Sequence, residues 1–250
     1  PAVTRTGLER EMLAMRNGGI GGFEVQPVYP MALDEPSKQF RNLQFLSPEF
    51  LETLRYTGEK ARELGLRFDL TLGSGWPYGG PSVPVTQAAG RLKVQKVKPD
   101  AAGRSVTPDI GNGERLVAVF GVKAGKHARL GQPVDGVMQT PAGAFDEVVF
   151  FISSRTGMMV KRPSIGAEGF VIDHYDRSAL DGYLKDVGSP LLDALGGRMP
   201  YAIFADSMEV FGSDLTPGFA AEFQRRRGYD LIPLLPSLMS DVDANSEAVR

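Results

Sequence analysis

Two acidic residues directly follow an apolar run in the last quarter of the chain. Residues 202–205 read AIFA, a pattern that predicts a short strand covered on both faces. Asp206 and Glu209 come next, and Met208 and Phe211 flank the second acid. A carboxyl group at the end of a strand can serve as a general acid or base, and apolar neighbours raise its pKa by desolvation. We therefore expect Glu209 to hold its proton near neutral pH.

Further polar and aromatic side chains follow other predicted strands. They are Gln26, Trp76, Tyr78, Asp173 and His174. Simpler interpretations stand beside a functional one: Glu209 as a solvated loop acid, Asp206 as a turn cap, Trp76 as a core aromatic under a turn. His174 is equally consistent with a satisfied structural histidine.

Helix and strand signals alternate along the first part of the chain. Residues 6–17 carry apolar side chains at helical spacing, and residues 20–29 alternate like a strand. A second helix over 47–65 has a capping serine, an early proline and a closing glycine, and a strand over 66–72 follows it. Helix followed by strand, twice, predicts a parallel sheet built from crossover units.

The middle of the chain has the sequence pattern of β-strands and turns, without helix signals. Residues 87–164 hold short β-branched runs separated by Gly, Pro, Asn and Asp, which predict an inserted antiparallel β subdomain. Strand and helix signals then alternate again. We expect strands over 169–176 and 201–207, a helix after Ser178, and a helix over 217–227 that is capped by Thr216. We expect four parallel strands whose carboxyl ends gather the candidate residues at one edge.

This pattern predicts an α/β protein in three segments. Residues 1–86 form the first part of the α/β layer, 87–164 the β-rich insertion, and 165–250 the continuation of the α/β layer.

Composition excludes several classes of function. The chain has 250 residues, a net charge of -2 and no cysteine, so we expect no nucleic-acid partner, no disulfide and no thiolate metal site. No apolar run approaches the roughly 20 residues of a membrane span, and no signal-peptide pattern lies within the chain. A periplasmic, secreted or cytoplasmic location all remain open.

Four blocks carry a family resemblance: GIGGFEVQPVYP, LTLGSGWPYGG, VIDHYD and DSMEVFGSDLTPGFAAEFQRRRGYDLIPLLP. They resemble the catalytic region of the glycoside hydrolase family 106 α-L-rhamnosidases. The resemblance implies a large, multi-domain bacterial enzyme with a (β/α)8 barrel that removes terminal rhamnose with inversion and holds a calcium ion at the sugar.

A complete barrel needs eight strands, whereas this sequence supplies about four. We therefore expect a partial (β/α)8 TIM barrel, truncated at both ends, because Pro1 precedes a helix instead of a first strand and the final SEAVR resembles the middle of a helix. The remainder of the polypeptide would complete the barrel. The chain alone is expected to be inactive and to associate through its open sheet edges.

The resemblance also implies roles for the candidate residues. It makes Glu209 the general acid. Because no second well-placed carboxylate is apparent, we expect the base outside this chain. From their positions and side-chain chemistry, we expect the carbohydrate contacts to be Gln26, Trp76, Tyr78, Asp173, His174 and Asp206. For the implied calcium ion, Glu24 is a weak ligand candidate, because no spacing in the sequence defines a site. Two alternatives stay open: a non-catalytic carbohydrate-binding remnant, and a different barrel glycosidase with retaining chemistry.

Overall fold

The computed structural model describes residues 2–239 and divides them into two compact units. The first unit consists of residues 2–89 and 157–211, and the second of residues 90–156 and 212–239. The structure differs here from the predicted segments, which assign everything after residue 164 to the α/β layer. Residues 212–239 instead belong with the β-rich unit, where Leu231 and Leu235 pack against Phe151.

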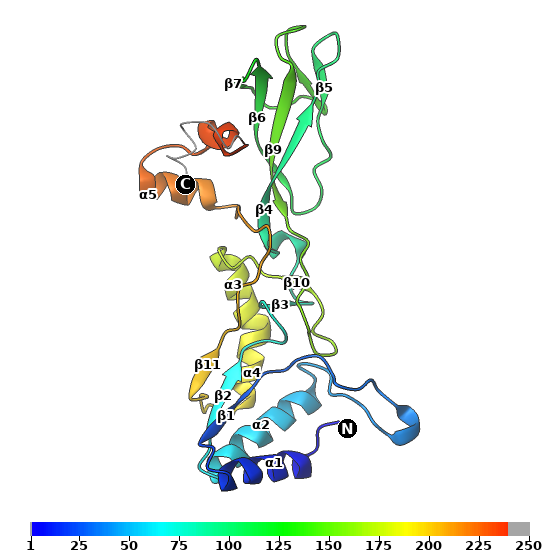
Figure 1. The fold of residues 1–250 in the computed structure, drawn as a ribbon, viewed down its shortest axis with the longest axis vertical. Helices are drawn as coiled ribbons and strands as arrows, with labels where there is room; N and C mark the ends of the chain where they lie inside the picture. Colours follow the sequence, from blue (N-terminus) through cyan, green and yellow to red (C-terminus); the bar gives the residue numbers. More distant parts are fainter. Residues whose placement is uncertain (1, 240–250) are drawn as a thin grey trace. The chain divides into compact units, whose positions relative to one another are not determined.

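A three-stranded parallel sheet forms the centre of the first unit (Figure 1). Its strands are β1 (Gly22–Val25), β2 (Arg67–Thr71) and β11 (Ala202–Phe204), in the order β1-β2-β11. Both pairs are parallel, as the crossover pattern predicts. Within the described part of the chain these strands make an open sheet and not a closed barrel.

Helices cover one face of this sheet. They are α1 (Arg5–Asn17), α2 (Pro48–Glu63), α3 (Arg177–Tyr183) and α4 (Ser189–Ala194), with a π-helical segment, Leu184–Gly188, between the last two. The Ser47 side chain accepts a hydrogen bond from the Phe50 N–H and so starts α2 as the sequence predicts. Leu70 of β2 is fully buried in the same core cluster as Leu54 and Leu191.

The predicted burial of the strand before Asp206 is wrong. Ile203 is 48% exposed and Phe204 is 42% exposed, although Leu70, the register partner of Ile203, is fully buried. The reason is position, because β11 is an edge strand of the described sheet and β2 is the central one.

The predicted fourth parallel strand over 169–176 is also wrong. Residues Phe170–Val171 form β10, which pairs antiparallel with β3 (Gly79–Gly80) in a separate two-stranded ribbon. Glycine makes this close pairing possible, because a Cβ on Gly79 would lie 2.2 Å from the Phe170 carbonyl oxygen. The parallel layer therefore has three described strands instead of four.

The second unit has the antiparallel β structure that the sequence predicts. Its main sheet has the order β4-β9-β6-β7. These strands are β4 (Gly90–Val97), β6 (Arg115–Lys123), β7 (Lys126–Arg129) and β9 (Glu147–Arg155), and a second ribbon pairs β5 (Arg104–Val106) with β8 (Val137–Gln139).

Helix α5 (Phe219–Arg227) also belongs to the second unit, and Gly228 ends it with a φ of 80°. The prediction that Thr216 caps this helix is wrong, because the N-cap is Gly218 and no side-chain cap bond forms. Short 3-10 segments occur at Pro36–Lys38, Val85–Gln87 and Ile232–Met239. The predicted helical ending SEAVR lies outside the described residues.

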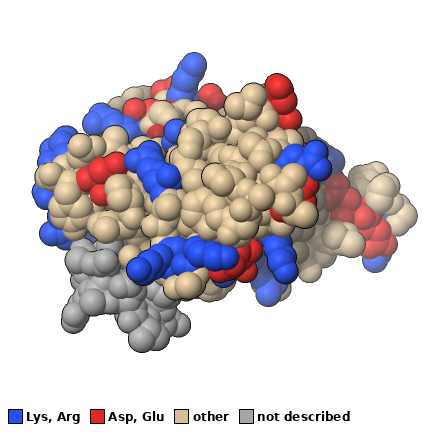
Figure 2. Space-filling view, turned by 90° about the horizontal axis from the view of Figure 1, so that it is seen from above, with Lys and Arg blue, Asp and Glu red and all other residues tan. Residues whose placement is uncertain are grey.

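The surface carries charges of both signs. On the face drawn in Figure 2, basic and acidic side chains are mixed, in keeping with a net charge of -2. In the part of the chain that the structure describes, no helix is long and apolar enough to cross a membrane.

The contrast between Leu70 and Ile203 gives a stability prediction. Leu70→Ala should lower the free energy of unfolding by about 2–5 kcal/mol, because it leaves a cavity in the core. Ile203→Ala, at the neighbouring position of an exposed edge strand, should cost less than about 1 kcal/mol. Urea unfolding followed by circular dichroism measures both, and equal losses would contradict this account of the core.

Candidate functional site

The carboxyl edge of the parallel sheet brings together residues that are distant in the sequence. Gln26 follows β1 directly, and Asp206 follows β11 by two residues. The Gln26 Nε2 donates a hydrogen bond of 3.0 Å to Asp206 Oδ2. Because β1 and β11 flank β2, this bond spans the end of the central strand and links two of the predicted site residues.

The loop after β2 carries Trp76 to the same edge. The Gly75 N–H donates to the Pro27 carbonyl at 3.0 Å, and Trp76 and Lys161 exchange two backbone hydrogen bonds of 3.0 and 2.8 Å. Gly75 has a φ of 65°, and a Cβ there would lie 2.2 Å from the Lys161 carbonyl oxygen. Only glycine therefore allows the loop to lie this close to the segment that contains Lys161.

Tyr78 has a structural role at this edge. Its hydroxyl donates a hydrogen bond of 2.7 Å to the Phe204 carbonyl at the end of β11, and its ring stacks on Tyr183 with centroids 5.4 Å apart. Burial raises the pKa of Tyr78, so the phenol stays protonated and remains a donor at neutral pH. The Tyr183 hydroxyl in turn donates to the Leu72 carbonyl at 3.0 Å. Tyr78 thus fixes the strand that leads to Asp206.

Glu209 is held by a lysine that the sequence analysis does not identify. The Lys161 Nζ lies 2.5 Å from Glu209 Oε2, and the two side chains are 33% and 47% exposed. This hydrogen bond and the charge of Lys161 lower the pKa of Glu209, and hydrogen bonds from Ser207 and Trp76 act in the same direction.

The expectation of a raised pKa at Glu209 is therefore wrong for this structure. Met208 is 66% exposed and Phe211 is 72% exposed, so neither side chain removes water from the carboxyl group. The apolar run in the sequence suggests a desolvated acid, but the segment lies at the surface beside a cation. Lys161 has no distinctive local pattern, because a lysine in the run VKRP resembles any solvated basic residue.

Asp173 and His174 follow the β10 ribbon and not a strand of the parallel sheet. Asp173 is 1% exposed, and its Oδ1 accepts a hydrogen bond of 3.1 Å from the Tyr175 N–H in its own turn. Burial lowers the pKa of His174, while the charge of Asp173 acts in the opposite direction. The imidazole is therefore neutral at pH 7, and its buried Nδ1 has no hydrogen-bond partner among the described residues.

Glu24 does not assemble a metal site with the described residues. Its Oε1 accepts a hydrogen bond of 2.7 Å from the Thr71 hydroxyl. Calcium requires six to eight oxygen ligands, and the described part of the chain contains no group of three or more His, Cys, Asp or Glu side chains that could hold a metal ion. These residues do not fit the calcium ion that the family resemblance implies.

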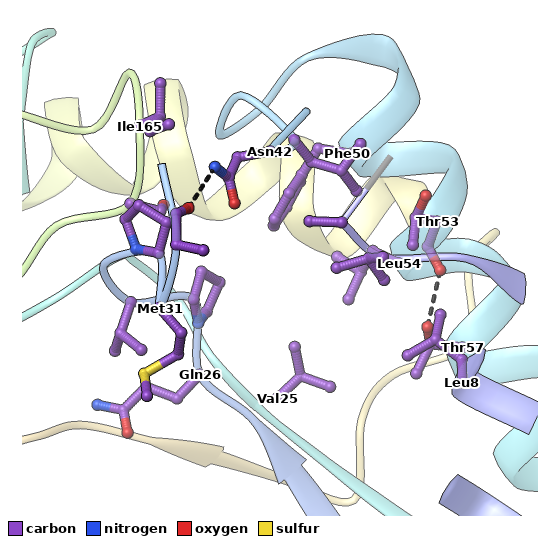
Figure 3. Close-up of a pocket in the computed structure, with 18 of the residues that line it drawn as sticks. Leu8, Val25, Gln26, Met31, Asn42, Phe50, Thr53, Leu54, Thr57 and Ile165 are labelled. Carbon is purple, nitrogen blue, oxygen red and sulfur yellow. Dashed lines mark hydrogen bonds between the residues drawn. The ribbon is translucent and has the colours of Figure 1, made fainter. Parts of the chain in front are cut away.

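A pocket of about 480 Å³ lies on the helix-covered side of β1 (Figure 3). Figure 3 shows Val25 of β1 and Phe50 and Leu54 of α2 around it, with Gln26 and Met31 close together at one end. None of the described residues that line it is charged. The pocket therefore has no acid or base for hydrolysis, and the candidate active site is the carboxyl edge of the sheet.

This edge combines the groups that a sugar-binding site needs. Asp206 and Glu209 supply acceptors, Gln26 and Lys161 supply donors, and Trp76 supplies a flat, partly exposed ring. The hydroxyl groups of a sugar ring can form hydrogen bonds with these acceptors and donors, and its apolar face can stack on the indole. The arrangement favours a carbohydrate ligand.

Comparisons with known proteins agree with this chemistry. A family model described as alpha-L-rhamnosidase, glycoside hydrolase family 106, matches residues 1–104 and 133–249. A protein of Formosa agariphila named "Putative beta-glucuronidase" is 36% identical over 76 residues, which are 29% of this chain and 6% of that protein.

A solved structure, a rhamnosidase from Novosphingobium sp. PP1Y, has a similar fold, with a TM-score of 0.64 and 16% sequence identity. The match covers 95% of this chain and 40% of that one. The chain therefore spans less than half the length of either relative.

The contact between Tyr78 and Phe204 gives a second prediction. Tyr78→Phe should keep the ring stack and lose one hydrogen bond, which lowers the free energy of unfolding by about 1 kcal/mol. The matched control is Tyr175→Phe, because Tyr175 is 72% exposed and its change should stay within about 0.5 kcal/mol. Urea unfolding measures both variants. A Tyr78→Phe variant as stable as the control would remove the proposed role of this hydroxyl.

Proposed function

The chain belongs to the glycoside hydrolase family 106 of α-L-rhamnosidases, and we propose that it is the part of such an enzyme that binds the terminal sugar and supplies one catalytic carboxyl group. The observation that carries the proposal is Glu209, which lies beside Trp76 and Lys161 at the carboxyl edge of the parallel sheet. Active sites of α/β barrels and open α/β sheets lie at this edge.

The proposed reaction is inverting hydrolysis of a terminal α-L-rhamnoside. Inversion needs one carboxylic acid that protonates the leaving oxygen and one carboxylate that activates water, roughly 6.5–9.5 Å apart. We assign the acid to Glu209 and the base to a residue outside this chain. Asp206, oriented by Gln26, would accept hydrogen bonds from sugar hydroxyls, and Trp76 would stack on the apolar face of the ring.

The general acid must carry a proton when the glycosidic bond breaks, whereas Lys161 keeps Glu209 ionised in the free site. Sugar binding would resolve this conflict. A sugar seated at the edge excludes water from the carboxyl group and separates it from the lysine, and both changes raise its pKa. The same movement would bring the protonated oxygen next to the glycosidic oxygen.

The remaining parts of the enzyme are proposed to complete the fold. The three-stranded sheet has two edge strands, β1 and β11, in the described part of the chain. We propose that strands from the rest of the polypeptide pair with them to close a (β/α)8 barrel. Such a barrel would also supply the catalytic base.

A glucuronide is the second candidate substrate. The protein of Formosa agariphila that shares 36% identity over 76 residues is named as a putative beta-glucuronidase. A uronic acid carries a carboxylate, which the Lys161 ammonium could bind. Assays with aryl α-L-rhamnoside and aryl β-glucuronide distinguish the two substrates.

Calcium is proposed for the complete enzyme only. The described residues do not assemble a site for it.

If Glu209 is the general acid, the rate lost on its substitution should depend on the leaving group of the substrate. In the complete enzyme, Glu209→Gln should slow cleavage of natural rhamnosides by roughly 10²–10⁴-fold, because an alkoxide leaves poorly without a proton. An activated aryl rhamnoside has a phenolate leaving group that departs without a proton, so its cleavage should keep much of the wild-type rate. Steady-state kinetics on both substrates measure the difference.

The matched control is Asp206→Asn, which should slow both substrates by a similar factor, as expected for a group that positions the sugar. If Glu209→Gln also slows both substrates equally, Glu209 is not the general acid.

The calcium proposal predicts that the activity depends on calcium but that the calcium affinity does not depend on Glu24. Removal of calcium with a chelator should lower the activity of the complete enzyme, and Glu24→Gln should leave the calcium concentration for half-maximal activity unchanged. Activity titrated against free calcium measures both. A weaker calcium response in Glu24→Gln would assign the ion to this chain.

A further inference from the structure

Lys161 is the charged group closest to the proposed acid, and its position is set by the backbone. Trp76 and Lys161 exchange two backbone hydrogen bonds, of 3.0 and 2.8 Å, so the lysine is fixed opposite the tryptophan. Its Nζ lies 2.5 Å from Glu209 Oε2 and 4.6 Å from the centroid of the Phe211 ring. The ammonium therefore has two partners, both on the segment that follows β11.

We propose that Lys161 is a positioning residue that holds the Glu209 carboxylate against Trp76 in the empty site and moves off it, toward Phe211, when a sugar binds. The proposal rests on the proposed function for its last step only. The first step, the hold on Glu209, concerns the free protein.

Three observations support the hold. The backbone pairing leaves only the side-chain torsions of Lys161 free, which lowers the entropy cost of the ion pair. Trp76 also acts on this carboxyl group and lowers its pKa, so two residues on paired segments favour the ionised form of Glu209. The Lys161 side chain is only 33% exposed, which limits screening of its charge.

The same geometry supports the release. Glu209 is 47% exposed and so accessible to a ligand from solvent. The Phe211 ring is 72% exposed and already lies within cation–π distance of the ammonium. A lysine displaced from the carboxylate would therefore keep one favourable partner while a sugar oxygen takes its place.

Other charged groups nearby are engaged elsewhere. Asp206 accepts from Gln26, and the Arg162 guanidinium stacks on the Tyr29 ring at 4.8 Å. Lys161 is the charged group that acts on Glu209, together with hydrogen bonds from Ser207 and Trp76.

The test uses Trp76 as an internal probe, because it is the only tryptophan of the 250-residue chain. Its fluorescence, followed from pH 7 downward, should show a transition as Glu209 takes up a proton, and Glu209→Gln should abolish it. Lys161→Met should move the midpoint to higher pH, since the carboxylate loses its cation. Lys161→Arg should restore a low midpoint.

Lys185→Met is the matched control, because Lys185 is an exposed lysine of the segment Leu184–Gly188 and should leave the midpoint unchanged. Circular dichroism checks that each variant is folded. Equal midpoints for Lys161→Met and Lys185→Met, or a wild-type chain without the transition, would overturn the hold. Neither result depends on rhamnoside cleavage, so the fluorescence titration can contradict the hold without contradicting the proposed function, which the cleavage assays test.

Catalysis by the complete enzyme gives a second readout of the hold. The pH dependence of kcat/KM reports the free enzyme, and its alkaline limb marks loss of the proton from the acid. Lys161→Met should move that limb to higher pH and Lys185→Met should not. The tryptophan titration of the 250-residue chain tests the release. Added rhamnoside should raise the wild-type midpoint toward that of Lys161→Met, and an unchanged midpoint with sugar bound would overturn the release.

Discussion

The pair of backbone hydrogen bonds between Trp76 and Lys161 is the constraint on which the candidate site depends. It joins the loop that leaves the central strand to a segment that lies more than 80 residues later in the chain. Without it, Trp76 would end a flexible glycine-rich loop and Lys161 would be one more surface lysine. With it, an indole, an ammonium and the Glu209 carboxylate occupy one end of the sheet. Gly75 is part of the same constraint, because any larger residue would collide with the Lys161 carbonyl.

The sequence predicts the regular elements well where local signals are strong. Ser47 starts α2, β1 and β2 pair in parallel, and the middle of the chain forms antiparallel sheets. It also predicts that Gln26 and Asp206 share an edge, because parallel strands end at the same side. These features follow from periodicity and capping, which act over a few residues.

The errors arise where the environment is set by distant parts of the chain. The run AIFA suggests a buried strand, but β11 is an edge of the described sheet and its side chains are exposed. The run FVID resembles a fourth parallel strand, but only its first two residues form a strand, and they pair antiparallel with two glycines of the loop after β2. The pKa of Glu209 depends on Lys161, 48 residues away, and nothing in the local sequence identifies that contact.

The first unit is built from two segments that are far apart in the sequence, and this affects the order in which the protein folds during synthesis. The central strand β2 ends at Thr71, and its second neighbour, β11, begins only at Ala202. At typical ribosomal rates the nascent chain waits on the order of 10 s between the two, with one edge of β2 unpaired. The intervening β-rich unit is meanwhile nearly complete and can fold first. Co-translational folding of this protein is therefore expected to begin in the middle of the chain, and the carboxyl edge of the parallel sheet is expected to assemble last.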